Sequence, residues 1–190
     1  GPPDGWEPYS FEKIPRKTVF ETVIEDGAPA LRAFADASAS ALRRKVAVDP
    51  AASPFIEWSW KIQGPVEMAS CSTKEGDDCA ARVMLLYDYE PARASLLERA
   101  KFESLRSIHG EYPPHAMLVY AWTEERESSA PVTSPYSGRV KVIPIRMGGR
   151  EAKKWLLERR NHLEDFRAAF GEEPAHIGWV ALMSDTDNTG

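Results

Sequence analysis

Two short acidic segments carry the side chains of this chain that are best suited to hold a metal ion. Asp77 and Asp78 precede one predicted strand, and Asp185, Asp187 and Asn188 follow another. Calcium takes about six to eight oxygen ligands, often from such loops. If the two strand ends are neighbours, the sequence predicts a calcium site, although the spacing is not that of an EF-hand. The alternative is turn structure, because Asp and Asn also bond to nearby backbone in turns.

A second set of side chains suits contact with a small ligand through aromatic faces and guanidinium groups. These predicted ligand-binding residues are Arg82, Tyr120, Trp122, Tyr136 and Arg139. Trp122 and Tyr136 border a long polar segment, 123–137, of a length that is often functional. Trp58 and Trp60 share one face of a predicted strand with Ile56 and Ile62, a pattern that favours a place in the core.

Arg82 interrupts an otherwise apolar predicted strand. A buried guanidinium needs a carboxylate partner, because an unpaired buried charge is very costly. Asp78, Asp88 and Asp185 are the candidate partners. Two interpretations remain open: an arginine that binds an anion in a pocket, and a structural ion pair.

The two cysteines of the chain, Cys71 and Cys79, flank a short loop that contains Gly76. Their spacing predicts a disulfide, which would indicate an oxidising compartment. The alternative is a pair of thiols near the end of a strand. Two cysteines with no nearby histidine make a poor zinc site.

The sequence contains no recognised catalytic motif, so we assign no catalytic residues from it. The four histidines form no zinc-protease pattern, and no nucleophile elbow or phosphate-binding glycine loop is present. The acidic segments, with Asp77, Asp78, Asp185 and Asp187, offer carboxylate pairs of the kind that glycosidases use. Tyr136, His115 and Arg139 match the proton-moving residues of a polysaccharide lyase, but only by residue type.

Alternation of apolar and polar residues indicates that strands position these side chains. The predicted strands are 17–24, 30–35, 41–48, 55–62, 80–89, 115–122, 139–146 and 176–183. Pro144 predicts an edge or a bulge in its strand. Apolar spacing predicts one helix over 149–170 and a second over 91–105. We expect one domain over residues 1–190, mainly β, a jelly-roll-like β-sandwich with one or two helices packed on it.

Composition narrows the classes of function and location. The chain has 190 residues and a net charge of -5, with no long Lys/Arg run, which argues against nucleic-acid binding. No apolar stretch is long enough for a transmembrane segment. We expect a periplasmic or secreted protein whose signal peptide has been removed.

Several motifs occur in an order that resembles a bacterial family, domain of unknown function 3047. They lie at Trp58–Lys61, Glu75–Asp78, Ala81–Val83, Tyr120–Trp122, Pro135–Tyr136, Asp165–Phe166 and, most distinctively, Met183–Thr189. The resemblance implies an exported protein of Gram-negative bacteria and no particular activity. Two features differ from the family pattern: the segment 123–126 replaces an Asn-containing turn, and the cysteine pair is particular to this chain. The family pattern also implies a further strand after Met183–Thr189.

From these observations we predict a non-catalytic binding module of the cell envelope, for carbohydrate. A polysaccharide-acting enzyme, lyase or hydrolase, is the alternative. A third possibility is a structural subunit of an envelope protein complex, since the sequence also allows a protein partner. Calcium is the one cofactor that the sequence suggests.

Overall fold

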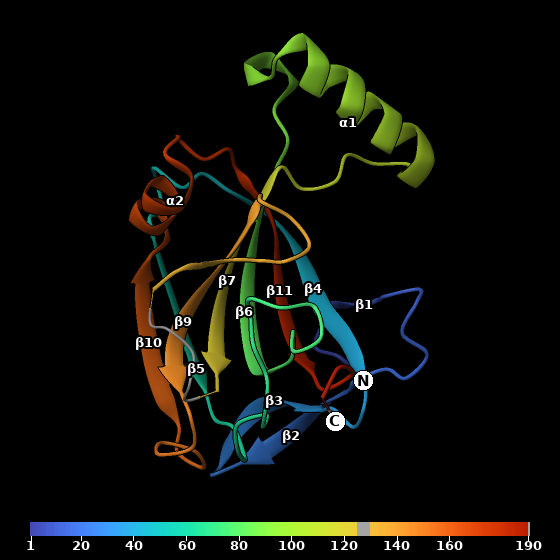
Figure 1. The fold of residues 1–190 in the computed structure, drawn as a ribbon. Coiled ribbons are helices and arrows are strands. Elements are labelled where there is room, and N and C mark those ends of the chain that lie inside the picture. The colour runs from blue at the N-terminus through green and yellow to red at the C-terminus, as the bar shows by residue number, and fades with distance from the viewer. Residues whose placement is uncertain (125–129, 190) are drawn as a thin grey trace.

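A seven-stranded sheet forms the centre of the molecule in a computed structural model that describes residues 1–124 and 130–189 (Figure 1). In spatial order its strands are β1 (Glu7–Ser10), β4 (Ala39–Val48), β11 (Ile177–Asp185), β6 (Cys79–Tyr87), β7 (Ala116–Thr123), β9 (Val140–Met147) and β8 (Val132–Thr133). The strands are antiparallel except that β7 and β9 run parallel. The predicted mainly β sandwich is therefore confirmed.

A second layer covers one face of this sheet. It consists of the paired strands β5 (Phe55–Trp60) and β10 (Leu156–Asn161) and the helix α2 (His162–Phe170). Between the layers, Trp60 packs against Trp122, and the rings of Tyr87 and Phe166 lie 4.4 Å apart. Burial of such large apolar surfaces is the main stabilising contribution to a sandwich.

Two elements lie at opposite ends of the molecule (Figure 1). The ribbon of β2 (Val19–Glu25) and β3 (Ala28–Phe34) forms one end. The helix α1 (Leu96–His109) follows a 3-10 turn, Pro91–Arg93, and stands away from the sheet at the other end. Its buried side chain is Phe102, whose ring stacks on that of Tyr89 at 3.9 Å. The ring of Phe102 also lies 6.0 Å from that of His115, so this one side chain contributes much of the packing that holds α1 to the body.

The helix predicted over 149–170 is wrong in its first half, because residues 156–161 form strand β10. Leu156 lies opposite Trp60 in the β5–β10 pair, and Glu158 accepts a hydrogen bond from the indole of Trp60 at 3.0 Å. These contacts with a distant strand override the helical spacing. The helix begins only at His162, where Asn161 accepts a capping hydrogen bond from the Glu164 amide.

The remaining predicted elements have counterparts. Each predicted strand corresponds to an observed strand, while β1, β8 and β10 were not predicted. The helix expected from Pro91 begins later, at Leu96, because Ser95 and Glu98 form a capping box there. The register of β7 against β9 shifts beside Pro144, as expected for a residue without an amide hydrogen. No helix in the described part of the chain is long and apolar enough to cross a membrane.

Candidate functional site

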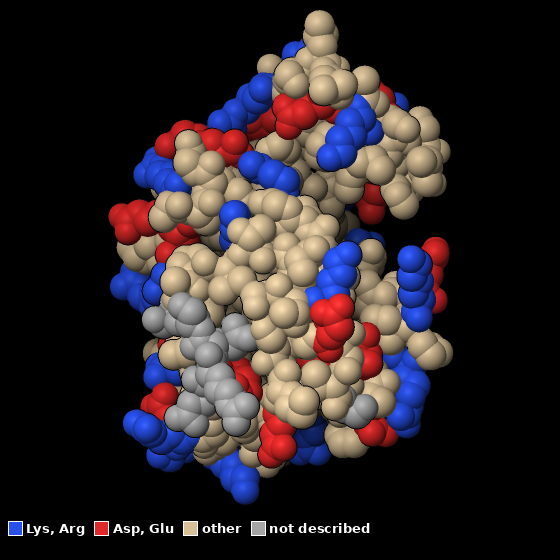
Figure 2. Space-filling view, in the orientation of Figure 1, with Lys and Arg blue, Asp and Glu red and all other residues tan. Residues whose placement is uncertain are grey.

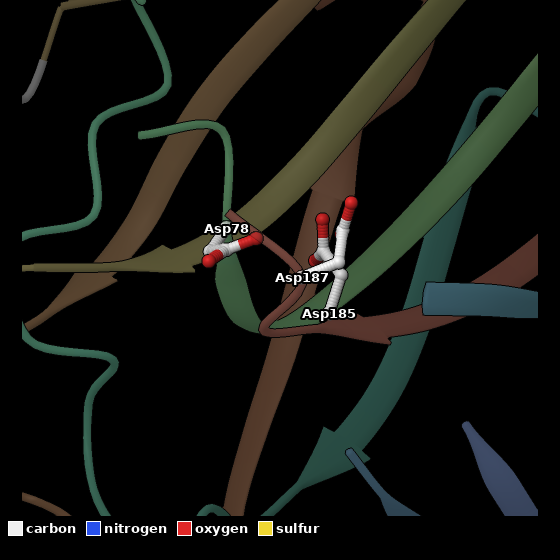
Figure 3. Close-up of side chains that lie close together, drawn as sticks. All are labelled: Asp78, Asp185 and Asp187. Atoms are coloured by element: carbon white, nitrogen blue, oxygen red, sulfur yellow. The ribbon is translucent and has the colours of Figure 1, made fainter. Parts of the chain in front are cut away.

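The two acidic segments meet where the start of β6 lies beside the end of β11. Figure 3 shows Asp78 from the first segment facing Asp185 and Asp187 from the second. One carboxylate oxygen from each residue lies within 4.8 Å of the others. Asp78 and Asp185 are buried and Asp187 is half-buried. The antiparallel pairing of β6 with β11 produces this juxtaposition.

Asp78 binds the segment that follows β11. Its carboxylate accepts hydrogen bonds from the backbone amides of Asn188 and Thr189, at 3.1 and 2.7 Å. It also accepts from the Asn188 amide side chain at 3.2 Å and from the Thr189 hydroxyl at 2.7 Å. These four donors satisfy a fully buried carboxylate, so Asp78 fixes the course of residues 186–189.

Arg82 and Asp185 form a buried ion pair beside Asp78. The guanidinium donates to both oxygens of Asp185, at 3.1 and 2.9 Å, and also to Asp77. The Cys79 amide donates to Asp185 as well. Burial raises the pKa of Asp185, and the Arg82 charge opposes that rise. The structure therefore favours the structural ion pair for Arg82 over binding of an external anion.

The partners of Asp78 and Asp185 bear on the predicted calcium site. Calcium binds through carboxylate lone pairs, and those of Asp78 and Asp185 already accept protein donors. Of the other three predicted ligands, Asp77 contacts Arg82, the Asn188 side-chain amide donates to Asp78, and Asp187 is half-buried beside Asp78 and Asp185. Arg82 is the cation paired with these aspartates among the described residues, so the cluster keeps an excess of negative charge, and the calcium site stays a prediction.

The two cysteines lie next to this cluster. Their Sγ atoms are 3.7 Å apart, which suits a thiol contact and exceeds the S–S bond length of about 2.05 Å. Both side chains are buried against Val119, Ala121 and Val142 on the second face of the sheet. The structure thus brings the pair together without a bond, and the disulfide stays a prediction.

The residues predicted to bind a ligand do not form one surface. Tyr120 and Trp122 are 0% and 1% exposed, because β7 is a central strand that is covered on both faces. Each uses its polar atom internally: the Tyr120 hydroxyl donates to Asp165 and the Trp122 indole to the Gly148 carbonyl. Tyr136 is exposed beside Lys74. An aromatic platform built on Tyr120 and Trp122 is therefore wrong.

Residues 125–129, which belong to the long polar segment between Trp122 and Tyr136, lie outside the described part of the chain.

Arg139 instead helps to line a cavity of about 240 Å³ beside α1, at the end of the sheet where β6 leads into the helix. Tyr89 and His115 also line it, as do Asp88 and Glu172. Figure 2 shows charged side chains of both signs around the lobe that contains α1. The cavity thus lies where the connections β6–α1, α1–β7, β8–β9 and α2–β11 meet.

Two buried polar atoms of the cavity residues have no hydrogen-bond partner within the described part of the chain. They are the hydroxyl of Tyr89, a residue that is 8% exposed, and Nδ1 of His115. Such unpaired buried groups are rare and call for an explanation, commonly a bound ligand or water. Burial raises the pKa of Tyr89, so its phenol stays protonated.

A charged network orients His115. Its Nε2 lies 3.4 Å from Glu172, and Arg139 donates to the same carboxylate at 2.5 Å. The Arg139 Nε also donates to the His115 carbonyl at 3.2 Å. Although burial opposes it, the contact with Arg139 lowers the pKa of Glu172. A carboxylate at Nε2 favours the tautomer with its proton there, which leaves Nδ1 as an acceptor.

The sequence singled out His115 and Arg139 by residue type but missed their partner. Tyr89 is the last residue of the predicted strand 80–89 and carries no distinctive motif. A weak signal was Gly178, because a glycine inside a strand can mark a close approach of another group. In the structure a Cβ at this position would lie 2.0 Å from an Asp88 oxygen. Only a glycine lets Asp88 occupy this position beside the cavity.

Comparison with known proteins places the chain in one family. The model of the family described as "Protein of unknown function (DUF3047)" matches residues 4–190, so the chain belongs to that family. A search of curated proteins gave no match.

Proposed function

We propose that this protein is an exported binding module of the cell envelope that binds carbohydrate in the cavity beside α1. One observation carries the proposal: Tyr89 offers a buried hydroxyl and His115 a buried ring nitrogen, both without partners in the described part of the chain. A sugar hydroxyl both donates and accepts, so neighbouring hydroxyls of one ring can satisfy both groups. A ligand that does so removes the cost of two unpaired buried groups.

The surrounding contacts support a preformed site. Glu172 and Arg139 fix the orientation of His115, and Phe102 stacks on the ring of Tyr89. Binding then costs little ordering of side chains, which favours affinity. The volume of about 240 Å³ is below the range of drug-sized sites and suits one sugar ring at the end of a chain.

The envelope location has a separate basis. It is supported by the family resemblance and by the cysteine pair, whose sulfurs lie close enough to be oxidised with little movement. Fractionation of cells that express the native gene tests it, because an envelope protein is released with the periplasmic or outer fraction. Recovery only with the cytosol would contradict this part of the proposal.

A titration of soluble glycans tests the binding. Tyr89→Phe removes the hydroxyl and keeps the ring, and we expect the affinity of a bound glycan to fall about fivefold to tenfold. Tyr112→Phe is the matched control, since that hydroxyl contacts Glu103 rather than the cavity. Absence of binding to any glycan, or equal affinities for wild type and Tyr89→Phe, would contradict the proposal.

A polysaccharide lyase is the second candidate, because Tyr89, His115 and Arg139 meet in one cavity. In this case Arg139 would have to exchange Glu172 for the sugar carboxylate, His115 would accept the proton next to that carboxylate, and Tyr89 would protonate the leaving oxygen. Elimination creates a carbon–carbon double bond that absorbs ultraviolet light. Incubation of the bound glycan with the protein, followed by absorbance over time, separates an enzyme from a binding module.

A further inference from the structure

The cavity beside α1 has a surplus of negative charge. Among the described residues its lining has five acidic residues, Asp88, Glu90, Glu98, Glu172 and Glu173, and two arginines, Arg93 and Arg139. Both arginines are already paired. Arg93 lies 3.1 Å from Glu90, and Arg139 lies 2.5 Å from Glu172. An acidic ligand would have to displace one of these carboxylates.

Among these acidic residues, Asp88 is the one best able to accept hydrogen bonds from a ligand. Its carboxylate accepts no hydrogen bond and forms no ion pair with any residue in the described ranges, whereas Glu98 caps α1 and Glu173 pairs with Arg167. Lys45 and His176 act on Asp88 only as nearby charges. Asp88 directly precedes Tyr89, so the unpaired carboxylate and the unpaired buried hydroxyl line the same cavity.

We infer that the carbohydrate bound in this cavity carries a protonated amine, as an amino sugar without an N-acetyl group does. The inference rests on the proposed function of the same site. The sugar hydroxyls pair with Tyr89 and His115, and the ammonium group pairs with Asp88. Hydrogen bonds between charged groups are about twice as strong as neutral ones, so the amine accounts for much of the selectivity.

Calorimetric titration of the full chain with three matched oligosaccharides tests the inference. These are glucosamine oligomers, their N-acetylated forms and a neutral glucan of equal length, with spermidine as an amine that is not a sugar. We expect the glucosamine oligomer to bind at least about tenfold more tightly than the other two. We also expect its advantage to shrink at high salt and when the amine is deprotonated.

Asp88→Asn is the decisive variant, and it should reduce the preference for the amine to less than about threefold. Glu12→Gln is the matched control, because it removes one exposed negative charge away from the cavity and should leave the preference unchanged. Equal affinity for glucosamine and glucan oligomers overturns the inference and leaves the proposed function standing. Absence of binding to every saccharide overturns the proposed function. Spermidine binding as tight as that of the amino sugar overturns sugar recognition.

Discussion

At the scale of single residues, Asp78 shows how a buried carboxylate can fix a chain segment. It accepts two backbone amides, one side-chain amide and one hydroxyl from Asn188 and Thr189. Asp78→Ala leaves these donors without their partner, and we expect unfolding free energy to fall by about 2–4 kcal/mol. Urea denaturation measures the loss.

Asp187→Asn serves as the control for Asp78→Ala. Because Asp187 is only half-buried, this substitution should lower the unfolding free energy by less than about 1 kcal/mol. Similar losses in both variants would contradict the special role of Asp78. Melting the wild type with calcium and with a chelator tests the predicted ion in the same series. A lower melting temperature with the chelator would support the predicted calcium site, and equal temperatures would show that the protein donors alone satisfy Asp78 and Asp185.

His162 makes the stability of the fold sensitive to acid. It is buried, with Nε2 2.7 Å from the Ser53 carbonyl and Nδ1 3.2 Å from the Tyr87 hydroxyl. Burial lowers the pKa of His162 below its ordinary value of 6.5, although the Ser53 contact opposes this. The unfolded chain therefore binds a proton before the folded protein does.

The stabilisation linked to His162 is thus fully present above about pH 6.5 and is lost as pH falls through the lower pKa of the folded state. Melting temperatures between pH 8 and pH 5 measure this loss. His162→Gln should reduce the fall in melting temperature on the acid side of this range. His176→Gln, which alters an exposed histidine, should leave that fall unchanged. A melting temperature that falls as steeply with acid in His162→Gln as in the wild type would show that His162 is not the cause.

At the scale of elements, helix α1 depends largely on one buried side chain, Phe102, whose ring contacts Tyr89 and His115. Phe102→Ala removes the stack on Tyr89, and burial of a phenylalanine contributes about 1.5–3 kcal/mol. We expect the amides of α1 to exchange their hydrogens about 10–100 times faster, while the sheet stays protected. Glycan affinity should fall too, because Ala94 and Glu98 form one wall of the cavity.

Leu97→Ala is the matched control for Phe102→Ala, since Leu97 is 83% exposed on the same helix. Exchange that rises equally in both variants would show that the stack does not hold α1.

The same scale explains what the sequence could and could not predict. The strand around Trp58 and Trp60 was predictable, because alternation records which face is buried. Residues 156–161 were not, because their spacing suits a helix and only the edge of β5 makes them a strand. The acidic segments were predicted to meet if their strands were neighbours, but their donors, the amides of Asn188 and Thr189, leave no trace in residue type. The cavity is formed by connections between elements that are distant in sequence, so residue patterns within one element could not predict it.

At the scale of the whole molecule, the cysteine pair links location to stability. Cys71 lies in the segment between β5 and β6, and Cys79 is the first residue of β6. Both belong to the small core on the face of the sheet opposite β5 and β10. A disulfide between them would link the segment between β5 and β6 covalently to the central sheet.

We expect protein isolated from an oxidising compartment to contain the Cys71–Cys79 disulfide, because the sulfurs start only 3.7 Å apart. Intact mass should then be lower by two hydrogen masses, and unreduced protein should resist alkylation. Closing so short a loop contributes about 2–3 kcal/mol by restricting the unfolded chain, so reduction should lower the urea midpoint of the wild type. Cys71→Ser, which cannot form the bond, should show no effect of the reductant. Alkylation of both thiols in protein from the envelope would contradict the disulfide while leaving the cavity proposals untouched, because neither cysteine lines that cavity.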